Sequence, residues 1–147
     1  MDYQREGGPS KASCPPGLEV LRGLRVVLVD DEPGVLRALT LLLEALHCKV
    51  TGFNTPNAAL TYLCSQPSVD FVLSDMRMPG LSGAELLKHL RASNFAAPFF
   101  LMSGHATHEE VTEARGAGLQ GFLSKPFTPR QLAELVSSIM AHPPCPE

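Results

Sequence analysis

Two kinds of segment alternate along this chain, and that alternation limits its fold more than any other feature of the sequence. Short runs of apolar residues are typical of strands buried on both faces of a parallel sheet. Such runs occupy residues 26–29, 49–53, 71–73, 99–102 and 121–124, of which the second and the last are the weaker. Each run is followed by a stretch with helical character, at residues 33–46, 56–64, 83–92, 109–117 and 129–140.

Five strand–helix pairs in a row predict an α/β fold, in which right-handed crossovers place helices on both faces of a parallel sheet. Two of the predicted helices begin with a threonine N-cap followed by proline, at Thr55 and Thr128. We expect the folded domain to cover residues 24–141, between an irregular tail at 1–23 and a proline-rich tail at 142–147. Leu18, Val20 and Leu21 offer a short turn that could pack on this domain.

Length and composition fit a single cytoplasmic domain. The 147 residues carry a formal net charge of −3, which argues against a protein that binds nucleic acid through a basic face. No apolar run approaches the ~20 residues that span a bilayer, so we expect no membrane insertion. The four cysteines lie far apart and form no CxxC pair, which predicts free thiols in a reducing compartment; they are Cys14, Cys48, Cys64 and Cys145.

Polar residues follow the predicted strands at the edge where open parallel sheets bind ligands. They are Asp30 and Asp31 after the first strand, Asp75 after the third, Ser103 after the fourth and Lys125 after the fifth. Taken singly, each has an ordinary explanation as a first-turn acid, a turn residue or a solvated lysine. Taken together, three crowded carboxylates repel one another and require a counter-ion. Carboxylate oxygens suit a hard cation, so this edge predicts a Mg²⁺ site with Lys125 beside it.

Four motifs at these strand ends resemble the receiver domain of two-component response regulators. They are VLVDDE at 27–32, LSDMRMPGLSG at 73–83, MSGH at 102–105 and GFLSKPF at 121–127. The resemblance covers nearly the whole predicted domain, and the motifs occur in the order that the family shows. It implies a flavodoxin-like (βα)5 fold with the doubly wound strand order 2-1-3-4-5.

The resemblance also implies roles for the acidic residues. Asp75 matches the phosphoacceptor, Asp31 a direct ligand of Mg²⁺, and Asp30 a ligand that acts through water. Arg77 occupies the position whose backbone carbonyl completes the metal site. A haloacid-dehalogenase phosphatase, which also forms an aspartyl phosphate, would need a second acid at residue 77, where this chain has arginine.

The remaining roles implied by the resemblance concern the switch. Lys125 matches the lysine that pairs with the acceptor and then with phosphate, Ser103 the hydroxyl that follows the phosphoryl group, and Phe122 the aromatic switch position. Arg77 and His105 fall where residues help to set the lifetime of the phosphoryl group. Both are bulky, and we expect them to hinder water and so prolong that lifetime.

The implied function is a signalling switch and not a turnover enzyme. A sensor histidine kinase or a histidine phosphotransfer protein would supply the phosphoryl group. The domain would assist its own phosphorylation and slow dephosphorylation. The surface formed by residues 109–117, 121–124 and 129–140 would then change, and so control a partner, an attached output domain or a phosphorylation-dependent homodimer. The alternative is a degenerate receiver that binds partners without phosphorylation, but such a chain would lose Asp31, Asp75 or Lys125, and all three are present.

Overall fold

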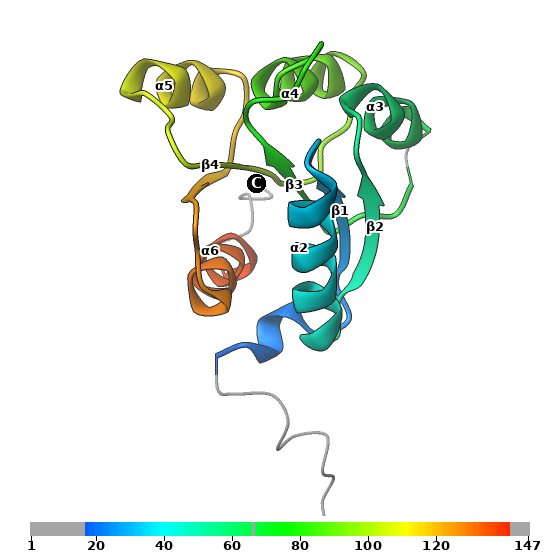
Figure 1. Ribbon diagram of the computed structural model, residues 1–147, viewed down its shortest axis with the longest axis vertical. Helices are drawn as coiled ribbons and strands as arrows, with labels where there is room; N and C mark the ends of the chain where they lie inside the picture. Colours follow the sequence, from blue (N-terminus) through cyan, green and yellow to red (C-terminus); the bar gives the residue numbers. More distant parts are fainter. Residues whose placement is uncertain (1–16, 66, 142–147) are drawn as a thin grey trace, which may run out of the picture.

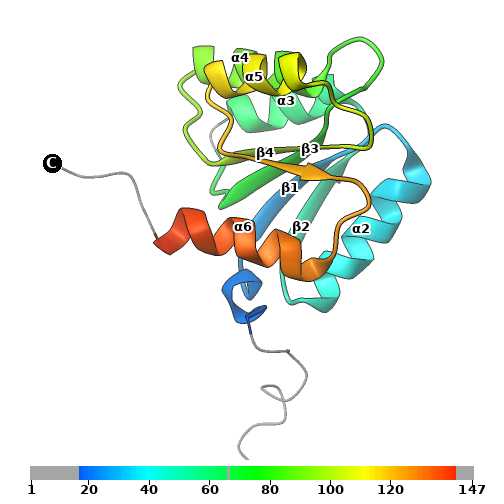
Figure 2. The same ribbon diagram turned by 90° about the vertical axis from the view of Figure 1, so that its left-hand side faces the viewer.

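Five parallel strands form the central sheet of the computed structural model, which describes residues 17–65 and 67–141 (Figures 1 and 2). The strands are β1 (Arg25–Val29), β2 (Lys49–Phe53), β3 (Phe71–Asp75), β4 (Phe99–Ser103) and β5 (Gly121–Ser124). They lie in the order β2-β1-β3-β4-β5, and every neighbouring pair is parallel. This arrangement confirms the predicted α/β fold and its strand order.

Helices cover both faces of the sheet: α2 and α6 lie on one face, and α3, α4 and α5 on the other (Figure 1). Their bounds are α2 (Pro33–Ala45), α3 (Pro56–Cys64), α4 (Gly83–Ala92), α5 (His108–Gly116) and α6 (Pro129–Ala141), each within one residue of its predicted end. Local caps fix where they start, since Thr55 accepts a hydrogen bond from the amide of Ala58, and capping boxes begin α4 and α5. Within the described ranges, no helix is long and apolar enough to cross a membrane.

The sheet separates two apolar cores. Val26 and Leu28 of β1 face the core beneath α2 and α6, whereas Val27 and Val29 face the core beneath α3, α4 and α5. All five residues of β4 are buried, as are the last four of β1 and the first four of β3. The continuous apolar runs therefore have the explanation that the sequence indicated, and the packing on both faces holds the carboxyl ends of the three central strands in fixed positions.

A short packed segment precedes residue 24, the expected start of the folded domain. A short 3-10 helix, η1 (Glu19–Leu21), precedes β1. Leu18 and Leu21 are buried in the same apolar core as Leu132 and Val136 of α6. The leucines of this segment cover one end of that core. The short turn suggested by Leu18, Val20 and Leu21 therefore does pack on the domain. Residues 1–16 and 142–147 lie outside the described residues.

The two cysteines within the described ranges are free thiols, as expected. Cys48 is buried and its thiol donates a hydrogen bond to the carbonyl oxygen of Leu21 at 3.2 Å. Burial raises the pKa of this thiol to about 11, so it stays protonated and unreactive at neutral pH. Cys64 is exposed. Cys14 and Cys145 fall in the segments that the structure does not describe.

Candidate functional site

Three carboxylates meet where the carboxyl ends of β1 and β3 lie side by side. Asp30 follows β1, Asp31 comes next, and Asp75 is the last residue of β3. One carboxylate oxygen of each lies within 4.8 Å of the others. Asp30 is completely buried, and Asp31 and Asp75 are half-buried. The parallel pairing of β1 with β3 produces this convergence, because it aligns residues 45 positions apart, such as Val29 and Ser74.

Lys125 closes the cleft from the loop after β5. Its Nζ donates hydrogen bonds to Oδ1 of Asp75 at 3.1 Å and to Oδ2 of Asp30 at 3.2 Å. Its backbone amide donates to the carbonyl oxygen of Ser103 at 2.8 Å, which ties the loop to β4. The peptide bond between Lys125 and Pro126 is cis. The lysine is thus held with its ammonium group between two carboxylates.

Backbone amides orient the two carboxylates that Lys125 contacts. Oδ1 of Asp30 accepts from the amide of Glu32 at 3.0 Å, and Oδ1 of Asp75 accepts from the amide of Met76 at 3.1 Å. Each carboxylate is therefore bonded to a backbone amide and to the ammonium group. Such fixed orientation is what a reacting group needs, because misplacement by about 1 Å is enough to slow a reaction greatly.

The site holds more negative than positive charge. Burial, with the charges of Asp30 and Asp31, raises the pKa of Asp75 above its ordinary value, although the hydrogen bond and charge of Lys125 oppose this. For Lys125, burial acts to lower the pKa, but the hydrogen bonds and charges of Asp75 and Asp30 outweigh it, and the pKa is raised. The lysine therefore stays protonated at neutral pH, and the cleft attracts a further cation.

The donor atoms of this cleft suit magnesium. Asp30, Asp31 and Asp75 offer only hard carboxylate oxygens, with a single ammonium group against three acids. Magnesium prefers such oxygens, takes few protein ligands and keeps several waters. Two of the three carboxylates are partly open to solvent, which leaves room for those waters. The three carboxylates expected to hold a metal therefore fit the ion.

Ser103 and Phe122 lie on neighbouring strands. Ser103 ends β4, is only 5% exposed, and its Oγ accepts a hydrogen bond from the amide of His105 at 3.1 Å. Phe122 of β5 pairs with Leu101, two residues before Ser103, and its half-buried ring packs on the α5 side of the sheet. The proposed switch hydroxyl and the proposed switch aromatic residue therefore lie on adjacent strands, two pairing positions apart.

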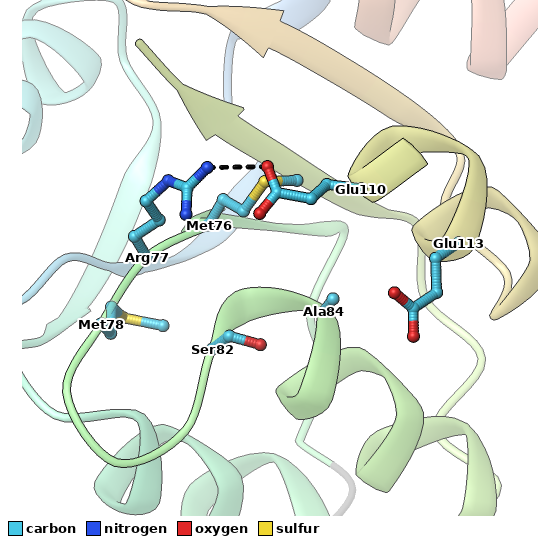
Figure 3. A pocket seen from close by; sticks show the side chains of 7 residues that line it. All are labelled: Met76, Arg77, Met78, Ser82, Ala84, Glu110 and Glu113. Atoms are coloured by element: carbon cyan, nitrogen blue, oxygen red, sulfur yellow. Dashed lines mark hydrogen bonds and ion pairs between the residues drawn. The ribbon is translucent and has the colours of Figure 1, made fainter. Parts of the chain in front are cut away.

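Arg77 and His105 meet through the backbone of His105. In Figure 3, the side chain of Arg77 points toward Glu110 of α5. Its Nη2 donates to Oε1 of Glu110 at 2.7 Å and to the carbonyl oxygen of His105 at 3.1 Å. The side chain of His105 is exposed. Beneath the ion pair lies a hollow of about 330 Å³, lined by Met76, Arg77, Met78, Ser82, Ala84, Glu110 and Glu113.

Sequence reasoning missed two residues that contact the acceptor or the loop after it. Gly83, the first residue of α4, lies against the carbonyl oxygen of Asp75, where a Cβ would clash. Glu110 holds Arg77. The spacing Thr107-x-x-Glu110 is a visible capping-box signal, but only the fold brings that box, 33 residues away, beside Arg77.

Comparison with known proteins now identifies the family. The model of the response regulator receiver domain matches residues 26–137. The chain belongs to this family. It is 36% identical over 115 residues to the transcriptional regulatory protein FixJ of Bradyrhizobium diazoefficiens, which covers 77% of this chain and 55% of FixJ. It is 33% identical over 125 residues to the chemotaxis protein CheY-3 of Vibrio cholerae, which covers 80% of this chain and 92% of CheY-3.

Solved structures of receiver domains share the fold. The crystal structure of FixJ-N has a TM-score of 0.74 and 27% identity, and the match covers 84% of this chain and 98% of that one. The receiver domain of a Pseudomonas aeruginosa sensor histidine kinase, solved with magnesium coordinated in its active site cleft, has a TM-score of 0.72 and 23% identity, covering 82% and 99%. Receiver domains are signalling phosphoacceptors that bind Mg²⁺ at an acidic pocket and interact with histidine kinases and output domains. This receiver domain spans about half the length of FixJ.

Proposed function

We propose that this receiver domain is a phosphorylation switch that accepts a phosphoryl group on Asp75 from a phosphohistidine of a sensor histidine kinase or a histidine phosphotransfer protein. One observation carries the proposal: the Asp75 carboxylate lies 3.1 Å from the Lys125 ammonium group, in a cluster with Asp30 and Asp31. A degenerate receiver, which binds partners without phosphorylation, would have no need to keep this complete set in contact.

The proposed reaction transfers one phosphoryl group between two nucleophiles. A carboxylate oxygen of Asp75 attacks phosphorus while the bond from phosphorus to the histidine nitrogen breaks, and the bonding electron pair returns to the imidazole ring. The product is a mixed anhydride on Asp75. Lys125, which already contacts the carboxylate, offsets negative charge on the phosphoryl oxygens, so the chain's contribution is mostly positioning and electrostatics. Attack by water on the same phosphorus later restores the carboxylate and releases phosphate.

The metal would be held by the residues that the sequence selected. Asp31 and Asp75 would bind it directly, Asp30 through a water molecule, and the backbone carbonyl of Arg77 would complete the protein ligands. When bound, Mg²⁺ supplies positive charge that offsets the charge on the phosphoryl oxygens. Asp30 keeps its contact with Lys125 at 3.2 Å and so also fixes the ammonium group beside the acceptor.

The switch would use the contact between β4 and β5. The Ser103 hydroxyl would move toward the phosphoryl group, and the ring of Phe122 would turn into the space behind it, without the hydroxyl of the tyrosine that is frequent in the family. The surface of α5, β5 and α6 would then change. The only buried residue of α5 is Ala114, so little packing opposes movement of this helix. That surface would control a partner, an attached output domain or a homodimer in the cytoplasm.

An apolar hollow beside the site offers a place for the phosphodonor to dock. It has a volume of about 500 Å³, lies between α2 and the loop after β5, and is lined by Gly34, Val35, Ala38, Leu39, Lys125, Pro126 and Phe127. Lys125 both lines this hollow and contacts Asp75. An apolar helix face of the donor seated here would bring its phosphohistidine to the acceptor.

Phosphorylation by a small donor tests the proposal directly. Phosphoramidate carries its phosphoryl group on nitrogen, as phosphohistidine does. With Mg²⁺, the intact protein should gain one phosphoryl group, whereas excess chelator should prevent this. Asp31→Asn should slow the reaction more than about tenfold, since it removes a metal ligand. Asp70→Asn is the matched control, because Asp70 accepts from the amide of Arg25, at the start of β1. A protein that gains no phosphoryl group under any condition would be a degenerate receiver.

A further inference from the structure

An exposed ion pair fastens the loop after the acceptor to the start of α5. Nη2 of Arg77, two residues beyond Asp75, lies 2.7 Å from Oε1 of Glu110. The two side chains are 56% and 36% exposed. Exposed ion pairs stabilise a fold weakly and exchange readily with other partners. This pair is therefore suited to a contact that forms in one state of the protein and opens in another.

Glu110 connects Arg77 to the backbone of α5. The same Oε1 accepts from the amide of Thr107 at 2.9 Å, and Oγ1 of Thr107 accepts from the amide of Glu110 at 3.1 Å. Glu110 therefore belongs to the capping box that begins the helix. A movement of Arg77 away from Glu110 removes a charged contact from the first turn of the helix that forms part of the proposed output surface.

Arg77 also restrains the loop that follows Ser103. Its Nη2 donates to the carbonyl oxygen of His105, whereas the amide of His105 donates to Oγ of Ser103, and both distances are 3.1 Å. The backbone of His105 is thus held from both sides. Movement of the Ser103 hydroxyl toward Asp75 must break or reorient its bond to His105, and Arg77 with Glu110 opposes movement of that residue.

We propose that Glu110 is a positioning residue for phosphorylation, which through Arg77 braces residues 103–107 in their unphosphorylated arrangement. The inference rests on the proposed function, because a phosphoryl group on Asp75 is the competitor that opens the brace. That group carries about −1.5 to −2 charge and binds a guanidinium group through two oxygens. Residues two apart are separated by at most about 7 Å along the backbone, so Arg77 is close enough to exchange Glu110 for it.

The ordinary explanation is that the ion pair only stabilises α5. The variant Glu110→Gln distinguishes this explanation from the proposed brace. Glutamine also serves at the third position of a capping box, so this variant keeps the cap and removes only the charge. Glu85→Gln is the matched control. Glu85 holds the same position in the capping box of α4, where it accepts from the amide of Ser82 at 2.9 Å.

The experiment measures how tightly each protein binds beryllofluoride, a phosphoryl mimic, at saturating Mg²⁺, by titration followed with amide NMR. Without the brace, the state that binds the mimic is reached more easily. Glu110→Gln should bind beryllofluoride about two- to fivefold more tightly than the unaltered protein, the range that an exposed ion pair supports. Glu85→Gln should bind it unchanged. In an Arg77→Gln background, Glu110→Gln should have no further effect.

A second measurement examines the unmodified protein. The amide of His105 should exchange its hydrogen faster in Glu110→Gln than in Glu85→Gln, whereas the amides of Leu28 and Leu73 in the core should exchange alike. Equal affinities and equal His105 exchange in the two variants would overturn the brace. Failure of the unaltered protein to bind beryllofluoride would instead overturn the proposed function. If Glu110→Gln tightened beryllofluoride binding just as much in the Arg77→Gln background, Glu110 would act only on its helix, and the brace would be overturned.

Discussion

Gly83 packs directly against the carbonyl oxygen of Asp75. A Cβ at this position would clash with that oxygen and would come within 2.5 Å of Cδ2 of Leu101. The amide of Gly83 donates to the carbonyl oxygen of Met76 at 2.9 Å, so the start of α4 is bonded to the residue after the acceptor. The position of the Asp75 backbone therefore depends on a residue with no side chain eight positions later.

Gly83→Ala should destabilise the fold and impair phosphorylation together. The added methyl group meets backbone, which cannot move aside as a flexible side chain can, and overpacking of this kind costs about 1–3 kcal/mol. Gly116→Ala is the control, because a Cβ at this last residue of α5 would have nothing within 4 Å. Denaturant unfolding and phosphoramidate labelling measure the two effects. Equal unfolding midpoints for both variants would contradict the close contact.

The sequence was sufficient to predict the sheet and the polar residues at its edge. Continuous apolar runs and threonine caps are local signals, and the strand ends follow from them, which placed Asp30, Asp75 and Lys125 in one cleft. Contacts between residues far apart in the chain could not be predicted from the sequence. Nothing in the local sequence shows that Arg77 meets Glu110, because that contact depends on how the loops after β3 and β4 lie relative to each other.

The burial of the segment before residue 24 could not be predicted, for a related reason. Glycines and prolines before it indicate a tail, but Leu18 and Leu21 are buried because α6, more than a hundred residues later, provides their apolar partners. A pair of leucines in a short segment has no periodicity from which burial can be predicted. The part that the sequence could not show is therefore the tertiary packing and not the local turn, which the sequence did suggest.

Lys125→Ala should leave the fold intact but separate phosphorylation from the response. The lysine contacts Asp75 and Asp30, and its loss leaves the charge of the cleft uncompensated. Amide NMR spectra with and without beryllofluoride should show large changes in α5 and β5 for the unaltered protein and much smaller ones for the variant. Lys88→Ala, which removes an exposed lysine 2.8 Å from Glu113, is the control. Equal changes in Lys125→Ala and the unaltered protein would refute this role.

The pH dependence of stability should reveal the crowded acids. Burial first, and then Asp30 and Asp31, raise the pKa of Asp75 above its ordinary value of 3.8, against the opposing effect of Lys125. The folded state therefore binds this proton more tightly than the unfolded state, and the resulting stability is present below pH 3.8 and lost as the pH rises through the raised pKa. In the absence of metal, Asp75→Asn should be more stable than the unaltered protein at pH 7. This advantage should vanish at pH values below the ordinary pKa of 3.8. An advantage that does not change with pH would contradict this.

Arg77 and His105 should prolong the life of the phosphoryl group. Once phosphorylation draws Arg77 away from Glu110, the guanidinium group can pair with a phosphoryl oxygen and hinder water. Phosphorylated Arg77→Ala, His105→Ala and the double variant should each lose phosphate faster than the unaltered protein at fixed Mg²⁺ and pH. Identical decay in all four would mean that these positions do not shield the anhydride. Slower loss of phosphate in the variants would contradict the shielding role and would indicate that His105 orients the attacking water.

The central claim is that Asp75 alone accepts the phosphoryl group. Borohydride reduces an aspartyl phosphate to homoserine, so the site can be read in peptides by mass spectrometry after treatment with phosphoramidate and Mg²⁺. Homoserine should appear at position 75 and at no other aspartate, and Asp75→Asn should yield none. Homoserine at another aspartate, or undiminished phosphate in Asp75→Asn, would contradict the account.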